Sequence, residues 1–422
     1  MENLILAVSI FVVVYGIIIS EKINKVAIAM IGASIIIILK IIDFDVAVTY
    51  IDYNTIGLLV GMMVIVSVLR STGVFEYLAI YVAKRVKGNP WGILSVLGIM
   101  TAVASSFLDN VTVVLLVVPV TLVITETLEI DPKPILISQI LLSNVGGTAT
   151  LIGDPPNVMI GSSTHLTFND FIINLGPVVL VTVVVFLGAL YLLYGKNMGA
   201  DEKNIKKLMR LDEKLSIRDK GRLKKSLVIL FMTIVSFWLA EFFDIELAVM
   251  ALFFAGIIVA VTKVDIEEVF LHVEWSSIAF FIGLFVMVGA LQEVGAIDIL
   301  AQGMLDVTKG DLLITTLVIL WGSGIVSSFL NNIPFVATMI PLITTLGADG
   351  MTTEPLWWAL ALGACFGGNG TIIGSSAGVI VAGASDKQGY KITFGEYMKV
   401  GMPLTILSLI VSTVFLYAKY FA

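Results

Sequence analysis

The chain has few of the residues that build disulfides, metal clusters and nucleic-acid surfaces. Its 422 residues include one cysteine, Cys365, and two histidines, His165 and His272. A single cysteine excludes an intrachain disulfide and a thiolate cluster. Both histidines stand near the ends of apolar runs, where we expect interfacial positions and no metal site. The net charge of -7 and the lack of a basic face interleaved with aromatic residues exclude nucleic acid as a partner.

Charge is also scarce, because 14% of the residues are charged and 58% are hydrophobic. A soluble globular protein of this composition would lack the polar surface to cover its exterior. We therefore predict an all-α polytopic membrane protein, with the lipid bilayer as its first partner. The run from Leu4 to Ser20 has no basic flank and no small-residue cleavage site, so we expect a retained helix and no cleaved signal peptide.

The apolar runs are of two kinds. Eight are long enough for one crossing of a bilayer, at 4–20, 24–42, 54–70, 170–195, 226–243, 246–263, 275–292 and 397–420. Four others are too long for one helix and are interrupted near the middle by polar, Gly or Pro residues, at 91–125, 134–162, 312–348 and 356–384. We expect the function to reside in these interrupted regions.

The basic residues predict the orientation. The hydrophilic segment 196–225 carries eleven Lys/Arg against five Asp/Glu, and "KRVK" at 84–87 adds a second basic cluster. The positive-inside rule places both in the cytoplasm, with 196–225 as a basic linker. Counting the spans from this linker puts both termini outside, in a multi-pass protein of the plasma (cytoplasmic) membrane.

The two halves of the chain resemble each other at an offset of about 222 residues. "SSFLDNVTVVLLVVP" at 105–119 aligns with "SSFLNNIPFVATMIP" at 327–341, and "GGTATLIGDPPNVMI" at 146–160 aligns with "GGNGTIIGSSAGVIV" at 367–381. The charge pattern gives the halves opposite orientations. We therefore predict two inverted repeats, 1–195 and 226–422, as in secondary transporters.

The interruptions predict local geometry. In "FLDN" and "FLNN", Asn110 and Asn332 are candidate N-caps and Pro334 suits a first helical turn, so we expect two re-entrant helical hairpins. The Gly-, Thr- and Ser-rich words of the other two regions predict helices that are broken by an unwound segment lined with oxygen atoms. Exposed helix ends and oxygen atoms can bind ions without a charged side chain.

Two lone acids stand in the interrupted regions of the first half. Asp109 is the only charged residue between Pro90 and Thr125, and Asp154 is the only one between Pro134 and Ser163. Their aligned partners in the second half are neutral, Asn331 and Ser375. An ionised carboxylate in a membrane costs several kcal/mol, so each acid must bind a cation or a proton or stay neutral. We predict that Asp109 and Asp154 couple transport to protons or cations.

The predicted ion-binding residues come from the four interruptions, and none is predicted to be catalytic. They are Ser105, Ser106, Asp109, Asn110, Thr112, Gly147, Thr148, Thr150, Gly153, Asp154, Asn157, Ser327, Ser328, Asn331, Asn332, Gly368, Asn369, Thr371, Ser375 and Ser376. We expect no cofactor other than Na⁺, for which Asp109, Asn110 and Asn332 are the candidate ligands.

The words "SSFLDNVT", "GGTATLIGDPPNV", "FLNNIPFVATMIP" and "GGNGTIIGSSAGV" resemble those of the ion transporter superfamily. Within it the chain is most similar to the group of ArsB arsenite exporters, NhaD sodium/proton antiporters and the melanosomal P protein, which has a citrate-transporter-like domain. The resemblance covers nearly the whole chain. It implies a scaffold and a mobile transport domain that work by an elevator mechanism, commonly as a homodimer, and a soluble ATPase partner if the protein is ArsB-like.

The resemblance also implies where the site lies. The hairpin tips would be Asp109-Asn110-Val111 and Asn331-Asn332-Ile333, where the related sodium–carboxylate symporters carry Ser-Asn-Thr. The aspartate resembles proton or cation exchange more than carboxylate symport. The unwound helices would be Gly146 to Asn157 and Gly367 to Gly378.

Three functions fit these features to different degrees. The favoured one is a secondary active antiporter of arsenite or antimonite, Na⁺, or an inorganic or organic anion. An ion channel of the same fold is the first alternative. An intramembrane aspartyl protease is a distant one, because Leu151 replaces the first glycine of the Gly-x-Gly-Asp word that such enzymes need. We therefore expect no enzyme.

Overall fold

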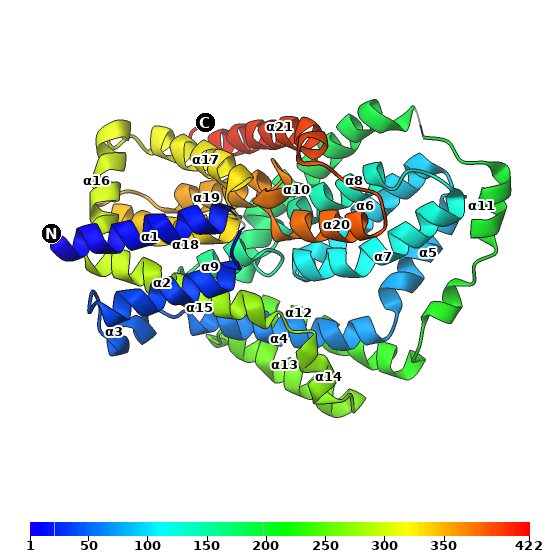
Figure 1. The fold of residues 1–422 in the computed structure, drawn as a ribbon, viewed down its shortest axis with the longest axis horizontal. Coiled ribbons are helices and arrows are strands. Elements are labelled where there is room, and N and C mark those ends of the chain that lie inside the picture. The colour runs from blue at the N-terminus through cyan, green and yellow to red at the C-terminus, as the bar shows by residue number, and fades with distance from the viewer. Residues whose placement is uncertain (21, 197) are drawn as a thin grey trace.

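The computed structural model describes residues 1–20, 22–196 and 198–422, and all regular elements within them are helices. Most long helices run roughly along one axis of the molecule (Figure 1). In the described part, nine helices are long and apolar enough to cross a membrane. Large apolar side chains such as Leu180, Val184 and Phe231 are exposed on their outer faces. The predicted all-α polytopic architecture is confirmed.

The simple spans form uninterrupted helices. They are α1 (Glu2–Ser20), α2 (Lys25–Ile38), α4 (Tyr53–Ser71), α10 (Phe168–Leu190), α12 (Lys220–Phe243), α13 (Leu247–Thr262), α15 (Trp275–Glu293) and α21 (Phe394–Tyr420). A π-helical turn, Tyr191–Gly195, extends α10. Helix α2 ends earlier than the predicted limit of 42, because Lys40 has a φ of 52° and the chain turns there into α3 (Phe44–Thr49).

Two pairs of these helices cross at glycines. Gly61 of α4 packs against the backbone of Ala251 in α13, and a Cβ at Gly61 would lie 2.6 Å from the Ala251 carbonyl carbon. Gly283 of α15 packs against Ala29 of α2, where a Cβ would lie 2.8 Å from the carbonyl carbon. Small residues let helix backbones approach closely in membranes. We call α1, α2, α4, α12, α13 and α15 the scaffold.

Two of the interrupted regions form helical hairpins. The first hairpin is α6 (Pro90–Phe107) and α7 (Asn110–Leu128), and the second is α17 (Leu312–Phe329) and α18 (Asn332–Ala348). Each pair is separated by two extended residues, Leu108–Asp109 and Leu330–Asn331. In Figure 1 the first hairpin lies on the right and the second on the left, and their tips approach each other near the centre.

The other two interrupted regions form broken helices. The first consists of α8 (Lys133–Gly147) and α9 (Pro155–Ser162), and the second of α19 (Glu354–Gly367) and α20 (Ser376–Lys387). The non-helical parts are residues 148–154 and 368–375, the latter with a 3-10 turn at Ile372–Gly374. They are shorter than expected, because Gly146, Gly147 and Pro155 to Asn157 are helical.

The second helix of each hairpin, α7 or α18, begins one residue earlier than the predicted N-cap residues imply. Asp109 is the N-cap of α7, and its side chain accepts the N–H of Thr112 at 3.0 Å. Asn331 is the N-cap of α18 and accepts the N–H of Ile333 at 3.2 Å. Asn110 and Asn332 are the first helical residues, so the prediction that they are the caps is wrong. The acid of the first tip therefore stabilises a helix start itself.

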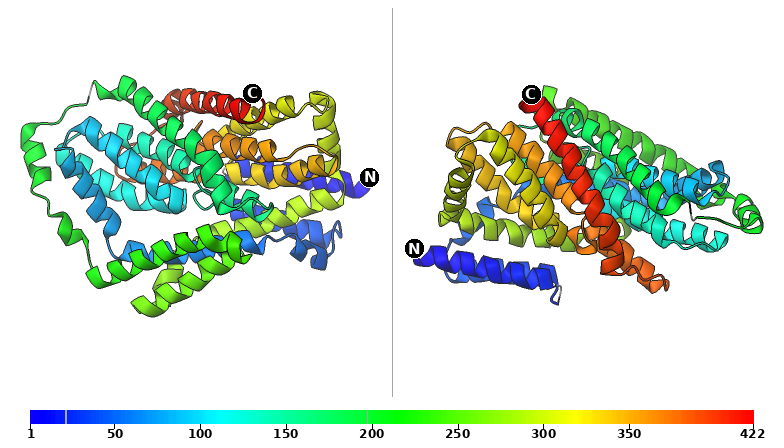
Figure 2. Two further views of the ribbon diagram at one scale, coloured as in Figure 1. Left: turned by 180° about the vertical axis from the view of Figure 1, so that it is seen from behind. Right: turned by 90° about the horizontal axis from the view of Figure 1, so that it is seen from above.

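Short helices complete the fold: α5 (Val74–Arg85), α11 (Glu202–Met209), α14 (Ile266–Leu271) and α16 (Ala296–Thr308). The described part of the predicted linker, residues 196 and 198–225, which we call the central segment, lies at the end of the molecule opposite the N-terminus (Figure 2). This segment packs against the helices, because Leu208 of α11 is buried and Lys84 of α5 forms a 2.6 Å ion pair with Glu213. This contact lowers the pKa of the Glu213 carboxyl group. Residue 197 of the predicted linker lies outside the described residues, and α12 begins at Lys220, inside the predicted linker.

The crossing of α2 and α15 predicts the effect of one methyl group. We expect Gly283→Ala to lower the unfolding free energy by about 1–3 kcal/mol, because the new Cβ would meet backbone atoms that cannot move aside. Thermal unfolding of the purified protein in detergent would measure the loss. Gly256→Ala in α13 is the matched control, because no atom of the described residues lies within 4 Å of its Cβ position and alanine favours a helix. Equal melting temperatures for the two variants would contradict this account of the crossing.

Candidate functional site

The tips of the two hairpins meet around a small buried chamber. Asp109 and Asn110 of the first tip, Asn332 of the second tip and Asp154 before α9 line it. Its volume of about 20 Å³ is enough for one water-sized occupant. Three of the four interrupted regions contribute these residues, and Ser376 of the fourth also lines the chamber.

Asp109 is held by the helix that it caps. Its Oδ2 atom accepts the backbone N–H of Thr112 at 3.0 Å and the Thr112 hydroxyl at 3.2 Å. The side chain is 8% exposed, so water reaches little of it. The partial positive charge at the start of α7 favours a negative group at this position. The backbone N–H of Val111 also contacts the carboxylate, but no Lys or Arg of the described residues lines the chamber to balance its charge.

Asp154 is the more deeply buried acid, at 1% exposed. Both of its carboxylate oxygens lie 3.4 Å from the side-chain nitrogen of Asn332, which comes from the second hairpin. It precedes Pro155 and Pro156, which have no N–H to donate, and its side chain makes no cap hydrogen bond to α9. One long amide contact and the weak donor of the Cys365 thiol do not compensate a buried negative charge. Asp154 therefore has unused capacity for a proton or a cation.

An amide network ties three of the interruptions together. The Asn110 side chain donates to Asn144 Oδ1 at 3.2 Å, and the Asn144 amide donates to Asn369 Oδ1 at 2.8 Å and to Ser375 Oγ at 3.0 Å. Asn369 in turn donates to the Leu141 carbonyl at 3.2 Å. Buried polar groups of this kind are stable only when each is partnered. The network fixes the first tip relative to α8 and to the second unwound segment.

Sequence reasoning missed Asn144. The signal was available, because Asn144 is an amide side chain in the largely apolar stretch 134–147, two residues before the first glycine pair. It was overlooked because it lies in the helix that precedes the glycine-rich motif and not in the motif itself.

Most of the predicted hydroxyl residues bind the backbone and do not face the chamber. Ser105 donates to the Ser143 carbonyl at 2.7 Å, Ser106 to Gly146 at 2.9 Å and Ser328 to Gly367 at 3.0 Å. Three threonine hydroxyls also donate to backbone carbonyls. Thr148 donates to the carbonyl of Asn144, Thr150 to that of Ser106, and Thr371 to that of Ser328. The Thr148 bond lies within the first broken helix, and the other bonds attach each hairpin to its neighbouring broken helix.

Several other predicted site residues also contact the backbone rather than the chamber. Asn157 donates to the carbonyls of Thr148 and Thr150, at 3.1 and 2.9 Å, and so closes the first unwound segment. Gly147 and Gly153 pack against each other's backbone, and Gly368 lies against the Cys365 carbonyl. Ser327 is buried and, within the described residues, its hydroxyl has no partner.

A larger cavity of about 650 Å³ adjoins the chamber on the side of the connection between α1 and α2. Asn331 and Ser376 line it, and the Asn331 amide donates to the Ser376 hydroxyl at 3.1 Å. Glu274, which precedes α15, lines both the cavity and the chamber. Sequence reasoning also missed Glu274, although it aligns with Asp52 at the offset of 222 residues. The cavity thus reaches both hairpin tips, through Val111 and Asn331.

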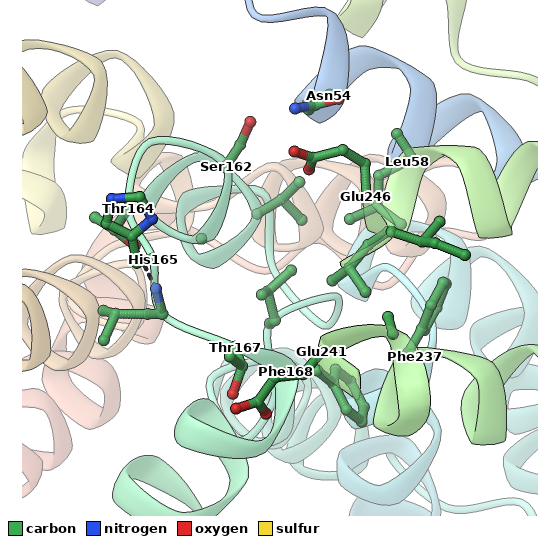
Figure 3. A pocket seen from close by; sticks show the side chains of 18 of the residues that line it. Asn54, Leu58, Ser162, Thr164, His165, Thr167, Phe168, Phe237, Glu241 and Glu246 are labelled. Atoms are coloured by element: carbon green, nitrogen blue, oxygen red, sulfur yellow. Dashed lines mark hydrogen bonds between the residues drawn. The ribbon is translucent and has the colours of Figure 1, made fainter. Parts of the chain in front are cut away.

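A separate cavity of about 360 Å³ lies between the α9–α10 connection and the α12–α13 connection. Figure 3 shows Ser162 and His165 on one side of it and Glu241 and Glu246 on the other. Neither chamber acid lines this cavity. His165 is thus a lining residue of a peripheral cavity, and His272 bonds the Glu268 carbonyl at 2.9 Å.

Comparison with known proteins agrees with this architecture. The family model described as Citrate transporter matches residues 15–363. Proteins of Mycobacterium bovis and Mycobacterium tuberculosis, both named uncharacterized transporters, are 41% identical to the chain, and the match covers 99% of either partner. The P protein of Homo sapiens is 30% identical over 97% of the chain, which spans 59% of that protein. The expected kinship with the P-protein group is confirmed.

The fold has a solved counterpart. The crystal structure of the Alcanivorax borkumensis YdaH transporter superposes with a TM-score of 0.63 and covers 99% of this chain and 98% of its own. At 13% identity this likeness concerns the fold alone. The family match and the relatives identify the function class: the chain belongs to the citrate transporter family and is a multi-pass membrane transporter.

Proposed function

We propose that the protein is a secondary active ion transporter whose coupling cation, H⁺ or Na⁺, binds at Asp109 and Asp154. The observation that carries this proposal is the chamber, in which two buried carboxylates stand without a Lys or Arg among the described lining residues. A proton or a small cation would neutralise these charges, whereas an anion alone would add to them.

The ligand set favours a hard cation. Carboxylate oxygens of Asp109 and Asp154 and the amide oxygens of the tips are the atoms that such ions prefer. Asn110 and Asn332 are the nearest amides, and both are nearly fully buried. For Na⁺, these residues together would supply oxygen ligands, and for H⁺ one of the two carboxylates would carry the proton.

The coupled movement follows from the repeat. We propose that residues 1–195 and 226–422 are inverted repeats and that the hairpins and broken helices move as one transport domain. Two observations support this: both hairpins break after a Ser-Ser-Phe-Leu word, and side-chain hydrogen bonds attach each hairpin to its broken helix. The scaffold would stay fixed while the domain carries the chamber across, in the manner of an elevator.

The cargo exchanged against the cation stays open between three classes. These are arsenite or antimonite, Na⁺, and an inorganic or organic anion, of which citrate is suggested by the family description. The two acids favour a positively charged or neutral cargo, because an anion would need the cation to bind first. The cytoplasmic position of the central segment, a homodimer and, for an ArsB-like cargo, a soluble ATPase partner stay predictions. No enzymatic activity is proposed.

The role of the two acids predicts the behaviour of conservative variants. We expect Asp109→Asn and Asp154→Asn each to lower coupled flux by about a hundredfold or more, because the amide cannot exchange a proton at this site and binds a cation weakly. Asparagine is a good N-cap, so Asp109→Asn should still fold. Flux in proteoliposomes under imposed pH and Na⁺ gradients would measure the effect.

The matched control for these variants is Asp386→Asn, because Asp386 lies exposed in α20, away from the chamber. Its flux should equal that of the unmodified protein. Undiminished coupled flux in both chamber variants would show that the acids do not couple transport. Currents far above the rate of conformational cycling would instead indicate the channel alternative.

A binding measurement separates Na⁺ from H⁺. A ligand that binds only the folded state stabilises it and so raises the melting temperature. At a concentration a hundredfold above the dissociation constant, the stabilisation is about 2.7 kcal/mol. If Na⁺ is the coupling ion, we expect it to raise the melting temperature more than choline does at equal ionic strength, and Asp154→Asn to abolish the difference. If H⁺ is the coupling ion, Na⁺ and choline should act alike, and flux should follow the pH gradient alone.

A further inference from the structure

Glu274 connects the buried chamber to the large cavity. Among the described residues it is the one carboxylate that lines both spaces, and its Oε2 atom accepts the Ser277 hydroxyl at 3.0 Å. It precedes α15 and therefore belongs to the scaffold, whereas Asp109 and Asp154 belong to the interrupted regions. The chamber is thus bounded on its cavity side by a carboxylate that the proposed movement of the transport domain would leave behind.

The charges around Glu274 suit a site that exchanges its partner. Asp109 of the first hairpin tip and Glu274 repel each other when both are charged. Lys25, at the start of α2, attracts the Glu274 carboxylate. Lys22 and Tyr15 of the α1–α2 region line the same cavity. The Lys25 ammonium also lies 5.4 Å from the centre of the Phe280 ring. A carboxylate between a basic side chain and an acidic one can release a bound cation to water, because Lys25 stabilises the carboxylate that remains.

Asp52 occupies the corresponding place at the start of α4. Its Oδ1 atom accepts the Ser162 hydroxyl at 2.6 Å and the Thr55 N–H at 3.0 Å. Ser162 is the last residue of α9, which starts directly after Asp154 and spans eight residues, or about 12 Å at 1.5 Å per residue. Asp52 therefore lies beyond the far end of α9, near the cavity of Figure 3, whose lining includes the neighbouring Asn54. Asp52 does not line that cavity, and its two oxygens are occupied by Thr55 and Ser162, so within the described residues Glu274 is the scaffold carboxylate at the chamber.

We propose that Glu274 is a cation acceptor of the scaffold, which takes the coupling cation from Asp109 and passes it to water in the large cavity. The proposal rests on the cation coupling and domain movement proposed above. For a proton, Asp109 becomes a carboxylate as Glu274 becomes a carboxylic acid, and the proton then leaves to water. For Na⁺, one carboxylate ligand replaces the other.

The substitution that tests this role is Glu274→Gln. Glutamine keeps the oxygen that accepts from Ser277 and removes only the charge and the titratable group. We expect turnover in proteoliposomes to fall about tenfold, while the stabilisation by the coupling cation, measured as the shift in melting temperature, stays as in the unmodified protein. Glu274→Asp should recover part of the turnover. The matched control is Glu267→Gln, seven residues away and exposed, which should change neither measurement.

The side on which Glu274 acts can be tested in membrane vesicles of opposite orientation. After a jump in cation concentration, Glu274→Gln should slow the charge displacement on the side of the α1–α2 connection and leave it unchanged on the other side. Size-exclusion profiles and melting temperatures would verify that each variant is folded, and Ser277→Ala gives the effect of losing the hydrogen bond alone.

Each remaining outcome speaks against the proposal. Turnover of Glu274→Gln equal to that of Glu267→Gln, in a protein whose unmodified form carries coupled flux, would overturn the acceptor role and leave the transport function intact. Loss of the cation-dependent stabilisation in Glu274→Gln would make Glu274 part of the primary binding site instead. Absence of any coupled flux in the unmodified protein would overturn the proposed function, and the acceptor role with it.

Discussion

The structure depends on the need to partner every backbone group that a broken helix exposes inside a membrane. Four helices are interrupted, and the freed carbonyls are taken up by side chains that look like binding residues in the sequence. Ser105 and Ser106 bond carbonyls of α8, and Asn157 bonds two carbonyls of the first unwound segment. Because these bonds join hairpin to broken helix, the breaks hold one another in place and a chamber forms where the tips meet.

This constraint explains why so few of the polar residues face the chamber. Hydroxyls that satisfy backbone groups are not free to bind an ion, which leaves Asp109, Asp154, Glu274 and the tip amides as the chemically available groups. Asp109 is a special case, because it stabilises the start of α7 and also lines the chamber. Its counterpart Asn331 has the same capping role without the charge. The two tips thus share a geometry and differ in chemistry.

Much of the architecture could be predicted from the sequence because the relevant signals are local. Apolar run length indicated the spans, and the words around Asp109 and Asn331 indicated the positions of the breaks. The cap was misplaced by one residue, since Asp and Asn are both good caps and only the backbone angles decide between neighbours. Asn144 and Glu274 were missed because each lies outside the conspicuous words, one within a helix and the other before a scaffold helix.

The sequence by itself determined the membrane architecture, the four interruptions and the two lone acids, because hydrophobic run length and the cost of a buried charge are properties of short segments. Only the tertiary structure decided which polar groups remain available. The contact of Asp154 with Asn332 joins residues 178 positions apart, and the contact of Asn144 with Asn369 joins residues 225 positions apart. Such pairings depend on how the hairpins and broken helices pack, and no local pattern encodes them.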